Sequence, residues 1–169
     1  MTLSLAVTTA TSHHVIGISE MKVSRRREDT LITYSLGSCV GLTLFDPVAG
    51  VGGLIHCLLP TGTLDAEKAR RQPCMFVDTG VPALLAAVLD AGASRRSLVA
   101  KAAGGANVFD DGGLFRIGER NTTMLRKILW KNEILLSAED MGGSKARTLS
   151  LEMSTGKCHL RTLQGKAEL

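Results

Sequence analysis

The sequence has few aromatic residues and no long apolar run, and both absences limit what it can be. Aromatic side chains make up 4% of the 169 residues, so the core must be built from leucine, valine, isoleucine and alanine. No apolar run approaches the roughly 18 residues that span a bilayer, so we expect no membrane insertion. The first residues, MTLSLAVTTATS, lack the basic start of a secretory signal. Together these features favour a cytoplasmic protein.

The sequence has four cysteines but no Cys-x-x-Cys pair, which argues against the commonest zinc and redox motifs. Four cysteines are also too few for a tight disulfide framework in a chain of this length, so we expect reduced thiols. The formal net charge of +4 is mild, and charge spread over the surface is its usual explanation. A run of three arginines, Arg25–Arg27, could meet an acidic partner, but a solvated turn is the favoured interpretation. We therefore expect no metal, no cofactor and no nucleic-acid partner.

The most informative stretch is Thr33–Pro60, which holds Cys39 in a glycine-serine turn and His56, followed directly by Cys57, in an apolar segment. Two segments rich in β-favouring residues, 40–45 and 53–59, flank a turn that contains proline and glycine. This pattern predicts a hairpin, and a hairpin brings residues of its two strands together. Cys39 lies just before the first strand, and His56 lies late in the second. We therefore predict that the thiol and the imidazole are spatial neighbours.

A thiol beside an imidazole is the minimum arrangement for a cysteine nucleophile, with His56 as the base. An imidazolium next to Cys39 would favour the thiolate by lowering the cysteine pKa. Backbone N–H groups in the turn formed by Gly37 and Ser38 could hold a developing oxyanion. The hydroxyl of Thr33, on the preceding strand, is a candidate to orient the base. The alternative is that Cys39 is a buried small hydrophobic residue, which is a common role for free cysteine.

Strand patterns outnumber helix patterns along the chain. Two helices are predicted, at 78–89 and 119–131, each with an apolar face. Short turns join several neighbouring strands, which favours antiparallel pairing. We therefore predict one α/β domain, a layered sandwich of mostly antiparallel or mixed β-sheet with two main helices packed outside. The predicted strands are 15–18, 31–35, 40–45, 53–59, 98–103, 134–138, 148–153 and 157–163. The domain is expected to span 13–164, between a flexible tail over 1–12 and a frayed end over 165–169.

Two loops are candidates for the rim of a substrate site. The polar segment 61–73 directly follows the strand of the predicted base, and surface loops commonly carry recognition. The glycine pair at 104–105 follows a predicted buried strand but lacks a Gly-Lys-Ser/Thr sequel. We therefore favour a close backbone passage beside the site over a phosphate cradle. The side chains of Asn107, Phe109 and Asn121 are possible rim residues, and either asparagine is a candidate contact for a substrate carboxamide.

Six segments, taken in order, resemble the signature of one family. They are Leu36-Gly37-Ser38-Cys39-Val40, His56-Cys57-Leu58-Leu59-Pro60, Phe76-Val77-Asp78-Thr79, Gly104-Gly105-Ala106-Asn107-Val108-Phe109, Ile117-Gly118-Glu119-Arg120-Asn121, and Glu139-Asp140-Met141-Gly142-Gly143 with Arg147. This set is similar to the chemoreceptor glutamine deamidases of bacterial chemotaxis, the CheD family. The resemblance covers roughly 15–163, nearly the whole chain.

The resemblance implies a cysteine nucleophile at Cys39, a base at His56 and a supporting threonine at Thr33. It implies a layered α/β fold similar to the catalytic domain of glutamine-deamidating bacterial toxins. The implied activity is conversion of selected glutamines in the cytoplasmic helices of methyl-accepting chemoreceptors to glutamate through a thioester. Hydrolysis of glutamyl methyl esters at such sites would pass through the same acyl-enzyme.

Two other functions stay open at this point. One is a binding module that regulates a CheC-type response-regulator phosphatase, a partner that the resemblance also implies. The other is a general cysteine amidase or protease, although no papain-type or caspase-type signature is present. Because Thr33, Cys39 and His56 occur together, catalysis is the favoured interpretation.

Overall fold

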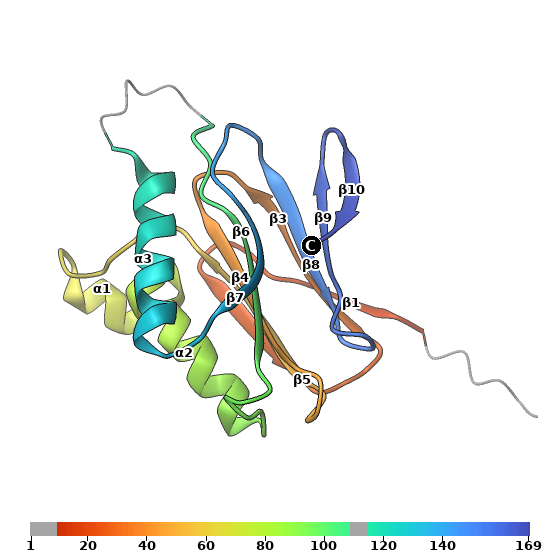
Figure 1. Cartoon of the computed structure of the whole chain (residues 1–169). Coiled ribbons are helices and arrows are strands. Elements are labelled where there is room, and N and C mark those ends of the chain that lie inside the picture. The colour runs from red at the N-terminus through yellow and green to blue at the C-terminus, as the bar shows by residue number, and fades with distance from the viewer. Residues whose placement is uncertain (1–9, 109–114) are drawn as a thin grey trace, which may run out of the picture.

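The computed structural model describes residues 10–108 and 115–169, which form two five-stranded sheets and two long helices (Figure 1). Sheet A has the strand order β1-β3-β8-β9-β10, and sheet B has the order β2-β5-β4-β6-β7. The strands of sheet A are β1 (Ser12–Val15), β3 (Asp29–Leu36), β8 (Arg147–Glu152), β9 (Cys158–Thr162) and β10 (Gly165–Glu168). Those of sheet B are β2 (Glu20–Ser24), β4 (Val40–Asp46), β5 (Val51–Cys57), β6 (Val99–Gly104) and β7 (Leu136–Met141).

The long helices are α2 (Val77–Asp90) and α3 (Ile117–Lys131). A short helix, α1 (Ala66–Arg71), and a single 3₁₀ turn at Pro73–Met75 precede them. The sheets are mixed, because β1 pairs with β3 and β6 with β7 in parallel, while the other described pairs are antiparallel. The predicted α/β sandwich of mostly antiparallel sheet with two main helices outside is therefore confirmed.

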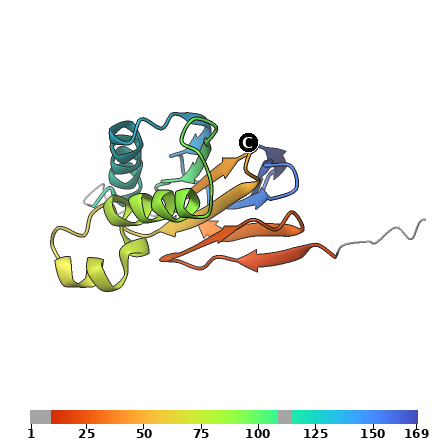
Figure 2. The same cartoon turned by 90° about the horizontal axis from the view of Figure 1, so that it is seen from below.

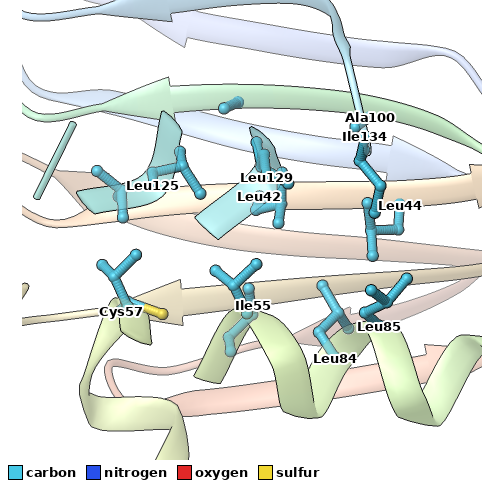
Figure 3. Close-up of a cluster of buried hydrophobic side chains, with 14 of the residues drawn as sticks. Leu42, Leu44, Ile55, Cys57, Leu84, Leu85, Ala100, Leu125, Leu129 and Ile134 are labelled. Carbon is cyan, nitrogen blue, oxygen red and sulfur yellow. The ribbon is translucent and has the colours of Figure 1, made fainter. Parts of the chain in front are cut away.

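The chain is arranged in three layers, with sheet B in the middle. Sheet A covers one face of sheet B, and α2 and α3 cover the other (Figures 1 and 2). Two hydrophobic clusters fill the gaps between the layers. Figure 3 shows part of the helix-side cluster, which includes Leu42, Leu44, Ile55, Leu84, Leu125 and Leu129. The cluster between the sheets includes Leu31, Leu36, Leu54, Leu149, Leu151 and Leu160.

Strands β4 and β5 are buried along their whole length, because both of their faces are covered. This explains why their sequences are almost continuously apolar and lack the polar–apolar alternation of a sheet with one wet face. Small residues allow sheet A to pack closely on this pair. A Cβ added at Gly52 would lie 3.1 Å or less from side-chain atoms of Phe45, Leu151 and Met153. The hairpin that carries the candidate site is thus the centre of the fold.

Several predicted elements differ from the structure. The first strand lies at Ser12–Val15, three residues earlier than predicted, and β2 was not predicted at all. The segment 61–73, expected to be a loop, contains α1. Residues 165–168 form β10 on β9 where we expected a frayed end, and the Leu169 N–H donates to the Cys158 carbonyl (2.9 Å). Within the described residues, no helix is long and apolar enough to cross a membrane.

Candidate active site

The three predicted catalytic residues lie on or beside strands of both sheets. Thr33 lies on β3 of sheet A, His56 on β5 of sheet B, and Cys39 immediately before β4. In the β4–β5 register Gly41 lies opposite His56, so Cys39 is the diagonal neighbour of the histidine. Residues two apart on a strand share a face, and this face of sheet B is the one that meets sheet A.

The hydrogen bonds of Thr33 determine which nitrogen of His56 carries the proton. The Thr33 hydroxyl donates to the Ile16 carbonyl oxygen (2.8 Å), which can only accept. Its other contact is His56 Nδ1 at 2.7 Å. Because a hydroxyl has a single hydrogen, Nδ1 must be the donor in that contact. In the neutral ring Nε2 then holds the free lone pair, and among the described residues it has no hydrogen-bond partner.

Burial keeps both reactive groups neutral at rest. His56 is 1% exposed, and desolvation lowers its pKa from 6.5 to about 4. Cys39 is also buried, and desolvation raises the pKa of its thiol, while its own backbone N–H acts in the opposite direction. The expected pair was a thiolate and an imidazolium; these pKa shifts instead favour a neutral thiol and a neutral imidazole.

The segment that carries the candidate nucleophile is hydrogen-bonded to the glycine loop after β6. The Gly105 N–H donates to the Cys39 carbonyl (2.8 Å), and the Ala106 N–H donates to the Gly37 carbonyl (2.8 Å). Gly104 has φ +115°, and a Cβ there would overlap the Cys39 carbonyl oxygen. The predicted close backbone passage at 104–105 is therefore confirmed.

A pocket of about 520 Å³ opens at Cys39. Its lining is Ser35, Gly37, Ser38, Cys39, Ala106, Asn107, Val108, Phe115, Ile117, Gly118 and Ala146. Asn107, a predicted rim residue, is part of this lining, and Phe109 lies outside the described residues. The segment 61–73 does not line this pocket, and its role as a rim stays a prediction. The mouth is apolar, because Val108 is 41% and Phe115 is 60% exposed.

Sequence reasoning missed Ser35 and Ala146 as lining residues. Ser35 has φ +58° in an irregular part of β3, where the register shifts between Thr33 and Leu36. Bulges of this kind redirect side chains next to active sites. The conformation of Ser35 leaves no motif in the sequence, and neither does the position of Ala146, directly before the neighbouring strand β8 of the same sheet.

Asn121 is not a rim residue, contrary to our expectation. It is completely buried on α3, and its Nδ2 donates to two carbonyls, Ser38 O (2.9 Å) and Leu58 O (3.0 Å). One carbonyl precedes the candidate nucleophile, and the other lies two residues after the candidate base. Asn121 therefore joins the two segments that carry the reactive groups.

The other three cysteines lie away from this arrangement. Cys57 follows His56 on β5 but points to the opposite face, into the helix-side cluster (Figure 3). Cys74 packs against the same cluster, and Cys158 is buried with its Sγ 3.3 Å from Thr43 Oγ1. Within residues 10–108 and 115–169 all four cysteines are free, and no group of three or more His, Cys, Asp or Glu residues could hold a metal ion.

The fold and the site together define a layered α/β protein in which a buried cysteine lines a pocket and a hydrogen-bonded threonine–histidine pair lies on the same sheet interface. The profile of the family described as CheD chemotactic sensory transduction matches residues 58–162. The chain is also 44% identical over 151 residues to the probable chemoreceptor glutamine deamidase CheD 1 of Syntrophus aciditrophicus, covering 89% of this chain and 94% of the relative. The chain therefore belongs to the CheD family.

Two further relatives carry the name probable chemoreceptor glutamine deamidase CheD. The protein of Solibacter usitatus is 45% identical over 155 residues, covering 92% of each chain. That of Pyrococcus abyssi is 44% identical over 152 residues, covering 89% of this chain and 91% of the relative. The family profile match begins after His56, but aligned segments of this length necessarily include both Cys39 and His56.

Proposed function

We propose that this protein is a protein-glutamine deamidase that converts selected glutamines of chemoreceptors to glutamate, with Cys39 as nucleophile and His56 as base. The observation that carries the proposal is the free, buried Nε2 of His56 on the same sheet face as Cys39. Its tautomer is set by Thr33, as a proton acceptor requires. The names of the relatives supply the reaction class and the substrate class.

In this mechanism the Cys39 sulfur attacks the carboxamide carbon of the glutamine side chain, while His56 Nε2 takes the thiol proton. Backbone N–H groups of the 37–39 turn stabilise the negative charge that develops on the amide oxygen. The imidazolium then gives its proton to the nitrogen, the C–N bond breaks, and ammonia leaves a thioester. His56 next deprotonates a water that attacks this thioester, and the proton returns to the sulfur as glutamate is released.

Glutamyl methyl esters are a second substrate class under the same proposal. Attack by Cys39 would form the same thioester, and methanol would leave in place of ammonia. The apolar pocket mouth, with Val108 and Phe115 exposed, favours a protein surface over a small polar amide as the substrate. We propose that the receptor helix lies on this mouth with one glutamine side chain directed at the sulfur.

The test is incubation of a purified helical fragment of a receptor cytoplasmic domain with the protein. We expect ammonia release and an amide-to-acid mass increase at particular glutamines, mapped by peptide sequencing. Cleaved peptides would instead identify a protease. A silent assay combined with firm binding to a CheC-type phosphatase would favour the regulatory binding module.

A further inference from the structure

The carbonyl groups of the nucleophile turn are all held by the protein interior. The Gly37 carbonyl accepts from Ala106, the Ser38 carbonyl from Asn121, and the Cys39 carbonyl from Gly105. Two of these donors are backbone amides, and only the middle one is a side chain. The orientation of the peptide that joins Ser38 to Cys39 thus depends on a single residue of α3.

Fixing the direction of the Ser38 carbonyl also fixes the direction of the Cys39 N–H group. The peptide is planar and trans, so its N–H points away from its C=O. With the Ser38 carbonyl directed at Asn121, the Cys39 N–H is turned to the opposite side. That side carries the reactive sulfur, since the same N–H acts on the pKa of the Cys39 thiol. By the same geometry, the bond from Ala106 to the Gly37 carbonyl turns the Ser38 N–H away from the glycine loop.

The amide of Asn121 is well suited to this task. Its two N–H hydrogens meet two carbonyl oxygens, which fixes the assignment of its nitrogen, because a flipped amide would place oxygen against oxygen. Its Oδ1 is buried and has no partner among the described residues. An apolar side chain at this position would remove that unpaired acceptor but would leave the Ser38 and Leu58 carbonyls without their donor. The two donated bonds therefore fix the direction of both carbonyls.

We propose that Asn121 is the positioning residue of the oxyanion hole. It holds the Ser38 carbonyl so that the Cys39 N–H faces the oxygen of the tetrahedral intermediate, and it ties the turn to the strand end after His56. This inference rests on the proposed function for its physiological meaning. Its chemical content, however, concerns any acyl transfer to Cys39.

Two small probes separate this role from general support of the site. Acylation by p-nitrophenyl acetate forms an S–C bond, expels p-nitrophenolate and passes through an oxyanion. Alkylation by iodoacetamide displaces iodide from a saturated carbon and forms no oxyanion. Both rates are read at the Cys39 peptide by mass spectrometry, with Cys39→Ser as the blank. Asn121→Ala should lower the acylation rate by about 10²-fold, the effect of losing one oxyanion donor, and change the alkylation rate little.

The matched control is Asn132→Ala, at the C-terminal cap of the same helix. Asn132 also donates its Nδ2 to a carbonyl, that of Ile128 (2.8 Å), but at the far end of α3. It should leave both rates unchanged. If Asn121→Ala does not fold, Asn121→Asp keeps the shape while setting a carboxylate oxygen against the two carbonyls, and the same split is expected. Equal losses with both probes, or no loss with either, would overturn the proposal.

Neither probe contains glutamine, so the test of the positioning role of Asn121 does not depend on whether receptor glutamines are substrates. A wild-type protein inactive on receptor fragments would remove the proposed function and leave this test intact. Active Asn121 variants with normal acylation would remove the positioning role alone.

Discussion

His56 shows how much the properties of one residue depend on its surroundings. The same burial that frees Nε2 from water also disfavours the imidazolium, which lowers the pKa to about 4. A histidine on the surface would be half charged near pH 6.5. Here the imidazole stays neutral through the whole physiological range, as the proposed base must.

The first prediction is an activity profile. If His56 must be neutral to act, kcat/KM should stay level from pH 8 to about pH 5 and fall only as pH approaches the His56 pKa of about 4. Rates should be taken from short incubations, with the fold checked by circular dichroism at each pH. An acidic limb centred near pH 6.5 would mean that the base is not the buried imidazole described above.

The second prediction concerns the free energy of unfolding and follows from the lowered pKa of His56. The unfolded chain takes up a proton on His56 below about pH 6.5, whereas the folded chain does so only below about pH 4. The unfolded state therefore binds more protons in this window, and stability falls as pH is lowered through it. The free energy of unfolding should lose up to about 3 kcal/mol from this residue. In urea titrations, His56→Gln should show a shallower fall between pH 7 and pH 4.

The third prediction concerns Thr33, which accepts from Nδ1 while donating to the Ile16 carbonyl. Thr33→Val keeps the shape but leaves two buried polar groups without a partner, so it should cost about 1–3 kcal/mol of stability. The rate of thioester formation should fall on the order of 10²-fold or more, since the tautomer is no longer fixed. Thr33→Ser restores the hydroxyl and should recover most of the activity; failure of this rescue would argue for a packing role.

At the scale of elements, the loop after β6 works as a support for the nucleophile turn. Gly104 and Gly92 both have strongly positive φ, +115° and +110°. A Cβ added at Gly104 would meet the Cys39 carbonyl, whereas one added at Gly92 would have no neighbour within 4 Å among the described residues. Alanine at either position strains the backbone by about 1–3 kcal/mol. Comparing alanine variants at the two positions therefore separates the effect of backbone strain, which both share, from the effect of contact with the Cys39 carbonyl, which arises at Gly104.

The fourth prediction uses this pair. Gly104→Ala should reduce the alkylation and acylation rates of Cys39 together, because it displaces the turn that carries the sulfur. Gly92→Ala should lower the melting temperature and leave both rates close to wild type. Similar kinetics for the two variants would show that the loop does not position the nucleophile.

The elements that could be predicted from the sequence are those whose own residues carry a strand, turn or helix pattern. The β4–β5 hairpin was predictable because two apolar runs flank a turn, and α2 and α3 because apolar residues recur at helical spacing. The short strand β2 was missed, since Glu20–Ser24 is mostly polar and its pairing with β5 supplies the order. For the same reason β10, a glycine-started polar end, was expected to fray.

The candidate site was predictable only in part. The proximity of Cys39 and His56 could be predicted because a hairpin brings its two strands together. The supporting role of Thr33 was predicted from the family resemblance and from its place on the preceding strand. The roles of Asn121 and Ser35 depend on contacts between α3, β3 and the turn, which are distant in sequence and set by packing of the layers. The protonation state of the pair was also beyond prediction, because it depends on burial between two sheets.

At the scale of the whole molecule, the layers bury the candidate catalytic residues, and the pocket opens to the surface at Cys39. A buried histidine behind an apolar entrance suits a glutamine side chain that projects from a large protein partner. Free glutamine makes none of the contacts of such a partner, and remote binding energy supports orientation at the reacting carbon. We expect free glutamine to be a very poor substrate in an ammonia-release assay; efficient turnover would indicate a metabolic amidase.

The central claim is that Cys39 carries out deamidation of receptor glutamines. The most direct measurement is the intact mass of a helical receptor fragment after incubation with the wild type and with four single variants. Cys39→Ala should leave every glutamine unchanged, whereas Cys57→Ala, Cys74→Ala and Cys158→Ala, each outside the site, should still convert the glutamines that the wild type converts, without backbone cleavage. Glutamine conversion by Cys39→Ala at the wild-type rate would contradict the account.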